Sequence, residues 1–142
     1  MTDQEVKDRL EILELLSRYS WALSDKDWDA WQAVFAAGAT VDYSTAGGPV
    51  GSPAEAALAF AGMLSMFDVA MSQVSNVVIT FEAPDRATCR SMYRMVMRIP
   101  GASPDDAGTY MEAQGAYEDL LTYTADGWRI ARRYEHLSYV RA

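Results

Sequence analysis

The sequence predicts an α+β fold, with N-terminal helices followed by a long antiparallel meander, as a single domain spanning residues 1–142. Apolar residues recur at helical spacing before about residue 70, whereas β-branched, alternating segments follow that point. The length suffices for one hydrophobic core, and no internal repeat or linker indicates a second domain.

The first predicted helix begins near the N-terminus. Thr2, followed three residues later by Glu5, is the pattern of a capping box, in which each side chain satisfies a backbone N–H of the first turn. The apolar face expected along this helix consists of Val6, Leu10, Leu13, Leu16 and Tyr19.

A short second helix is predicted after a break near Ser24-Asp25, with Gly38 as its stop. The segment 39–44 is strand-like and leads into a flexible stretch at 46–49. The apolar face of this second helix would consist of Trp28, Trp31, Val34 and Phe35.

A third helix is predicted from Ser52 onward. Ser52 is a favourable N-cap, Pro53 fits the first turn, and Glu55 stands at the capping-box position. The large apolar residues expected along it are Leu58, Met63, Met66 and Phe67.

Strands are expected from about residue 70 to the C-terminus, at 74–82, 88–99, 110–123 and 128–140. Pro84-Asp85 marks the first turn, and the segment 100–106 is rich enough in Pro, Gly and Asp to be a loop. Asp126-Gly127 is a strong hairpin signal.

Composition excludes several classes of function. A formal net charge of −8 argues against nucleic-acid binding, because phosphate contacts need clustered Lys and Arg. No apolar run approaches the roughly 20 residues of a membrane span, and the N-terminus lacks the features of a signal peptide, so we expect a cytoplasmic protein. With one Cys, one His and no glycine-rich phosphate loop, the sequence indicates no disulfide, no typical zinc site and no cofactor.

Several short motifs, spread along nearly the whole chain, together form a pattern that can be compared with known families. They are Asp27-Trp28-Asp29, Val41-Asp42-Tyr43, Ser72 with Asn76, Gly115-x-Tyr117-x-Asp119, and Asp126-Gly127-Trp128-Arg129-Ile130. This set resembles the SnoaL-like family of the nuclear-transport-factor-2-like superfamily, which includes scytalone dehydratase and SnoaL-type cyclases. The resemblance implies a cone-shaped α+β barrel, in which N-terminal helices pack in a curved mixed or antiparallel sheet and leave one deep pocket. It also implies a homodimer formed through the outer sheet face.

The resemblance also implies where a catalytic pair would stand. Scytalone dehydratase works with an Asp-His pair, and the corresponding positions here hold Ser24 and Ser72. Any chemistry must therefore be carried by other residues. A one-residue shift could let Asp25 replace the missing Asp.

Strand alternation, applied to the family's strand pattern, predicts which side chains face the pocket. The polar set expected around one cavity is Tyr43, Tyr93, Tyr117, Asp119, Arg133 and Glu135. The expected substrate-binding residues are Trp21, Ser24, Met63, Met66, Phe67, Ser72, Met95, Met97, Tyr117 and Leu137. His136 is expected on the opposite face of the sheet.

The polar set suggests acid/base chemistry. Burial raises the pKa of a carboxyl and a paired Arg lowers it, so Glu135 and Asp119 could serve as acid and base, with Arg133 setting their charge states. Tyr43 and Tyr93 would orient a substrate oxygen. A structural Asp119–Arg133 salt bridge is the alternative for that pair.

The favoured function is a cofactor-independent cyclase of specialised metabolism, such as antibiotic biosynthesis. It would close a cyclic ether by attack of a hydroxyl on an epoxide within a small, apolar, oxygenated substrate. A dehydratase or isomerase using the same pocket is one alternative. A non-catalytic ligand-binding or accessory subunit is another.

Overall fold

The computed structural model describes residues 1–142. In it, the two longer helices begin at the positions that their capping residues predict. The Glu5 N–H donates to the Thr2 hydroxyl at 3.1 Å and the Thr2 N–H donates to the Glu5 carboxylate at 2.8 Å, so α1 (Asp3–Asp25) starts with a complete capping box. Ser52 caps α3 (Pro53–Met63) by accepting from the Glu55 N–H. These local signals fix where both long helices start.

The buried face of α1 differs from the predicted one. Val6, Leu10 and Leu13 are exposed, and the residues that face the core are Ile12, Leu15, Leu16, Tyr19 and Leu23. Apolar residues recur at three- and four-residue spacing on both sides of this helix, so spacing alone does not identify the side that meets the sheet.

The second helix is shorter than predicted, because Gly38 does not end it. α2 (Trp28–Ala33) is capped by Asp27, and β1 (Phe35–Asp42) begins two residues after α2 ends. Gly38 lies inside β1 with φ 73°, where the register against the last strand shifts between Phe35 and Thr40. The glycine therefore allows a strand irregularity, a role that sequence does not distinguish from a helix stop.

The sheet is mixed and six-stranded, with the order β2-β1-β6-β5-β4-β3. β1 and β6 pair in parallel, and all other neighbours pair antiparallel. The remaining elements are η1 (Ser44–Ala46), β2 (Val50–Gly51), β3 (Val69–Ala83), β4 (Arg86–Ile99), β5 (Thr109–Thr124) and β6 (Gly127–Arg141). This arrangement confirms the predicted α+β class and the Asp126-Gly127 hairpin.

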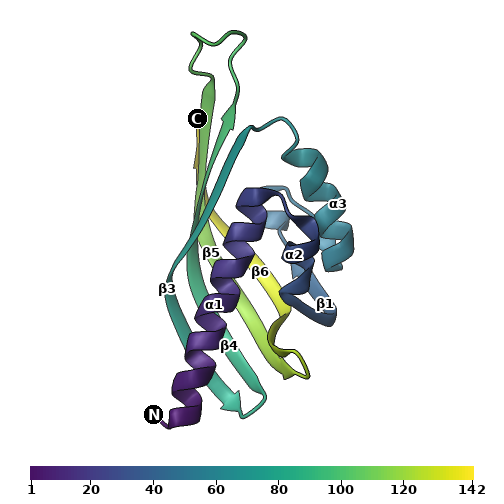
Figure 1. Cartoon of the computed structure of the whole chain (residues 1–142), viewed down its shortest axis with the longest axis vertical. Coiled ribbons are helices and arrows are strands. Elements are labelled where there is room, and N and C mark those ends of the chain that lie inside the picture. The colour runs from purple at the N-terminus through teal and green to yellow at the C-terminus, as the bar shows by residue number, and fades with distance from the viewer.

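The helices lie together on one side of the long sheet (Figure 1). α1 runs along the strands, α2 and α3 gather beside β1, and the β4–β5 hairpin projects beyond the helices at the top of the view. No helix combines the length and the hydropathy needed to cross a membrane.

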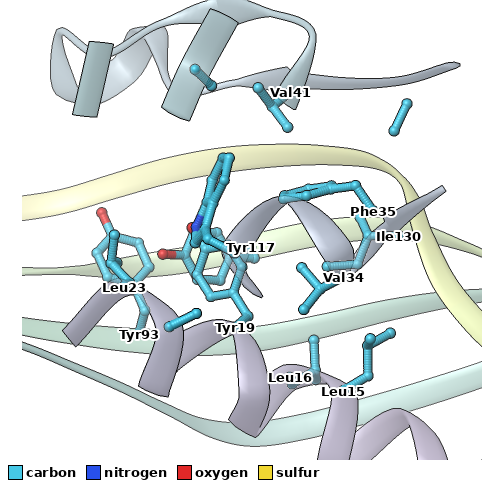
Figure 2. Close-up of a cluster of buried hydrophobic side chains, with 14 of the residues drawn as sticks. Leu15, Leu16, Tyr19, Leu23, Val34, Phe35, Val41, Tyr93, Tyr117 and Ile130 are labelled. Atoms are coloured by element: carbon cyan, nitrogen blue, oxygen red, sulfur yellow. The ribbon is translucent and has the colours of Figure 1, made fainter. Parts of the chain in front are cut away.

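The core between helices and sheet has two chemically different ends (Figure 2). Leu15, Leu16, Val34 and Ile130 gather at one end with Phe35. Tyr19, Tyr93 and Tyr117 gather with Leu23 at the other. The tyrosine end is where the sheet and helices leave a cavity.

Candidate active site in an apolar cavity

The cavity has a volume of about 250 Å³ and is enclosed by α1, α3, β4, β5, β6 and the segment around η1. Sixteen of its eighteen lining residues are hydrophobic, and Glu135 is the only charged one. The lining consists of Tyr19, Leu23, Tyr43, Ala46, Gly48, Phe60, Met63, Leu64, Phe67, Tyr93, Met95, Met97, Met111, Ala113, Tyr117, Glu135, Leu137 and Val140. No group of three or more His, Cys, Asp or Glu side chains is arranged to hold a metal ion.

Glu135 reaches the cavity because alternation along β6 turns it to the same side of the sheet as Leu137. It is 7% exposed, and its Oε1 has no hydrogen-bond partner. Burial raises the pKa of this carboxyl from 4.5 to about 7, while the nearby Tyr93 hydroxyl and the Arg133 charge lower it. A carboxyl in this state exists in both protonation forms at neutral pH.

Tyr93 stands beside Glu135 and is fixed by its neighbours. Its ring stacks on Tyr117 with centroids 4.6 Å apart, and its hydroxyl has no well-formed hydrogen-bond partner in the protein. A Cβ at Gly115 would lie 2.8 Å from Cε1 and 2.9 Å from the hydroxyl oxygen of Tyr93. Burial, followed by the Glu135 charge, raises the pKa of Tyr93, so this hydroxyl stays protonated.

A second pair of hydroxyls lies elsewhere in the lining. Tyr19 from α1 and Tyr43, just after β1, share a hydrogen bond with 2.8 Å between their oxygens. Burial is the main cause that raises the pKa of Tyr43 well above its usual value. The helical spacing predicts Tyr19 only as part of the core and gives no sign of its place in the cavity. Leu23, four residues later on the same helix face, also lines the cavity.

Asp119 and Arg133 do not line the cavity, contrary to the expected cluster. Arg133 donates from Nε and Nη2 to the two carboxylate oxygens of Asp119 at 2.8 and 2.7 Å, and both side chains are buried. The guanidinium carbon lies 4.2 Å from the Tyr19 ring centroid and 3.9 Å from that of Tyr117. Both oxygens of the Asp119 carboxylate are thus bound by Arg133, which is the structural salt bridge given above as the alternative for this pair.

The other predicted residues divide into two groups. The substrate-binding candidates that line the cavity are Met63, Phe67, Met95, Met97, Tyr117 and Leu137. Trp21 and Met66 do not line it, and they are 69% and 59% exposed. Trp21 lies two residues after Tyr19, which turns it by about 200° around the helix axis and away from the core.

Ser24 and Ser72 lie in a separate hollow of about 370 Å³ between α1 and β3. The Ser72 N–H donates to the Ser24 hydroxyl at 2.9 Å, and that hydroxyl donates to the Ser20 carbonyl at 2.8 Å. The two serines therefore meet each other but do not line the cavity that contains Glu135. Asp25 is exposed at the end of α1, and His136 lies on the outer sheet face, 3.2 Å from Glu118.

Comparisons with known proteins agree with this architecture. Residues 4–134 match the SnoaL-like domain family. An uncharacterized protein of Mycobacterium tuberculosis strain H37Rv is 29% identical over 131 residues, covering 92% of this chain and 86% of its own length. The crystal structure of the Kfla4162 protein from Kribbella flavida is 26% identical, with a TM-score of 0.84 over 96% of this chain and 95% of that one.

Two more distant structures show the fold alone. A Novosphingobium aromaticivorans protein, assigned provisionally as a scytalone dehydratase, is 20% identical, with a TM-score of 0.85 over 99% of this chain and 91% of that one. The hexachlorocyclohexane dehydrochlorinase LinA-type3 from Novosphingobium barchaimii LL02 is 11% identical, with a TM-score of 0.77 over 97% and 91%. At these identities no residue role is carried over.

Proposed function

This chain belongs to the SnoaL-like domain family, and we propose that it is a cofactor-independent acid/base enzyme of the isomerase or lyase type. The observation that carries the proposal is the Glu135 carboxyl, buried in an apolar cavity without a salt-bridge partner and with a pKa of about 7. A general acid/base works best when its pKa lies near the working pH. Burying a carboxyl without a partner costs stability, and groups of this kind cluster at functional sites.

The substrate is a small and largely apolar molecule that carries oxygen. The cavity volume of about 250 Å³ lies just below the roughly 300–1,000 Å³ of typical ligand sites. Four methionines, Met63, Met95, Met97 and Met111, give the lining flexible apolar side chains that adapt to ligand shape.

The reaction that we propose is ring closure to a cyclic ether, as in specialised metabolism. A substrate hydroxyl attacks an epoxide carbon, so that one C–O bond forms while the epoxide C–O bond breaks. The Glu135 carboxylate accepts the proton of the attacking hydroxyl. The Tyr93 hydroxyl donates its proton to the released oxygen and regains one from Glu135, so the product is an isomer of the substrate and the enzyme is restored.

A second candidate is dehydration or double-bond isomerisation in the same cavity. Glu135 is the only carboxylate in the lining, and one group that removes a proton and then returns it suffices for such steps. The predominantly apolar lining also suits a non-catalytic ligand-binding subunit.

The test compares wild type with Glu135→Gln on hydroxy-epoxides and β-hydroxy carbonyl compounds, with products followed by mass spectrometry and chiral chromatography. We expect the substitution to lower turnover by about 10²–10⁴-fold while ligand affinity is retained. Glu118→Gln, at an exposed carboxylate on the outer face of the sheet, is the matched control. Equal turnover in wild type and Glu135→Gln would remove Glu135 from the mechanism. Ligand-induced thermal stabilisation without turnover would identify a binding subunit.

We also propose that two copies associate through the outer face of the sheet. Val78 on β3 and Met92 on the adjacent strand β4 are apolar side chains exposed on that face. Sedimentation velocity should give a dimer in wild type and a larger monomer fraction in Met92→Glu. A monomeric wild type would contradict this proposal.

A further inference from the structure

The Tyr19–Tyr43 pair holds more hydrogen-bonding capacity than the protein uses. Two hydroxyls carry two protons, and the single bond between them, 2.8 Å long, uses one. Neither hydroxyl has a further side-chain or backbone acceptor. Both tyrosines are buried and both line the cavity, so the second proton has a possible acceptor only inside that cavity. A buried donor without an acceptor is destabilising, which points to a ligand or water oxygen as its partner.

The surroundings of Tyr19 make its hydroxyl a strong and well-oriented donor. The Arg133 guanidinium lies 4.2 Å from the Tyr19 ring centroid, held there by its two bonds to Asp119. A fixed cation over the ring stabilises the partial negative charge that develops on the phenol as its hydroxyl donates. The ring itself is held between Trp31 and Tyr117, with centroids 5.7 and 5.8 Å away.

We propose that the Tyr19–Tyr43 pair is a donor site for an acceptor oxygen of the ligand, and that Tyr19 is a specificity-determining residue. In this arrangement Tyr43 donates to Tyr19, and Tyr19 donates to a carbonyl, epoxide or ether oxygen. A hydroxyl that already accepts a hydrogen bond is a better donor, which gives the pair an advantage over one tyrosine.

This inference rests on the proposed function and narrows its substrate class. The ligand carries two oxygen functions, one that reacts beside Glu135 and Tyr93 and one that accepts from Tyr19. A hydrocarbon with a single polar group satisfies only one of these positions. A neutral carbonyl, epoxide or ether oxygen fits this position, because the Arg133 charge behind the Tyr19 ring is already paired with Asp119.

The test is a binding comparison between 2-tetralone and tetralin, two probes of the same shape that differ in one carbonyl oxygen. Calorimetric titration of wild type should give about five- to tenfold tighter binding of the ketone, the effect of one hydrogen bond. Tyr19→Phe/Tyr43→Phe removes only the two hydroxyls and should bind both probes equally. Tyr93→Phe, and Tyr123→Phe at an exposed tyrosine, should keep the preference for the ketone.

Equal binding of the probes by wild type would overturn the inference, as would an unchanged preference in the double variant. A preference lost in Tyr93→Phe and kept in the double variant would also overturn it, by placing the oxygen at Tyr93. If circular dichroism shows that the double variant is unfolded, Tyr19→Phe alone must lower the preference. Glu135→Gln should retain the preference, so the outcome does not depend on whether Glu135 catalyses turnover.

Discussion

Asp119 and Glu135 are two buried carboxyls in neighbouring positions with opposite surroundings. On the paired strands β5 and β6, Asp119 lies opposite Arg133 and Glu135 lies opposite Tyr117, one alternation step away. They are 4% and 7% exposed. Asp119 receives two hydrogen bonds from Arg133, whereas Oε1 of Glu135 receives none. Two carboxyls that are equally buried therefore differ in chemical state, because one has an arginine partner and the other has none.

The physical basis is the cost of removing a charge from water. A paired and hydrogen-bonded ion is tolerated in the interior and becomes part of the structure. An unpaired carboxyl avoids the cost by keeping its proton, which raises its pKa into the range where acid/base catalysis operates. The Tyr19 and Tyr117 rings contact Arg133 and also line the cavity, so they lie between these two environments.

Asp119→Asn should produce the largest effect, because it leaves the Arg133 charge buried without its partner. We expect a loss of about 3–5 kcal/mol in the free energy of unfolding, measured by urea denaturation. Replacing both partners, as Asp119→Leu/Arg133→Met, should cost much less than the single substitution. A loss below about 1 kcal/mol for Asp119→Asn would mean that the ion pair is not structural.

Glu135→Gln should change how stability depends on pH. The folded-state pKa of about 7 lies above the ordinary 4.5, so the native state keeps a proton that the unfolded chain releases in this interval. The contribution to stability is fully present below pH 4.5 and is lost as pH rises through about 7, a fall of about 3 kcal/mol in the free energy of unfolding. Urea denaturation across this range should show this fall in wild type but not in Glu135→Gln. Glu14→Gln, at an exposed helix position, should keep it. Parallel curves for wild type and Glu135→Gln would contradict the raised pKa.

Tyr93→Phe sharpens the same comparison with a smaller effect. The Tyr93 hydroxyl lowers the pKa of Glu135, so removing it should raise that pKa above its wild-type value. Carbon-13 NMR titration of the glutamate carboxyls measures this directly. An unchanged or lower pKa would show that the hydroxyl does not interact with Glu135 in solution.

Glu112→Gln should have the smallest effect, although Glu112 has more partners than Asp119. It accepts hydrogen bonds from Arg94, Gln114 and Arg141, which hold its pKa down at about 2. The two arginines of this surface cluster are 49% and 68% exposed and remain hydrated when it is broken. The urea midpoint at neutral pH should therefore stay within the error of the fit. A clear shift would mean that this cluster holds the projecting β4–β5 hairpin in place.

The sequence by itself determined the features that depend on near neighbours in the chain. The capping residues at Thr2 and Ser52, the hairpin at Asp126-Gly127 and the alternation that turns Glu135 inward all act over a few residues. Such interactions are visible as fixed spacings, which is why the α+β class could be predicted. Alternation also showed which strand residues share a face, and the resemblance to the family's strand pattern then indicated that the face with Glu135, Tyr93 and Met97 is the inner one.

Only the tertiary structure decided which of those residues meet. Asp119 and Glu135 are both acidic residues at inward-facing positions of alternating strands, so the sequence does not distinguish them. Only the packed structure shows that Arg133 binds the Asp119 carboxylate. The rotation of α1 against the sheet brought Tyr19 into the cavity, turned Trp21 to solvent and set Ser24 and Ser72 in a different hollow. These outcomes depend on contacts between segments far apart in the chain, and a periodic pattern fixes the faces of a helix without fixing which neighbour each face will meet.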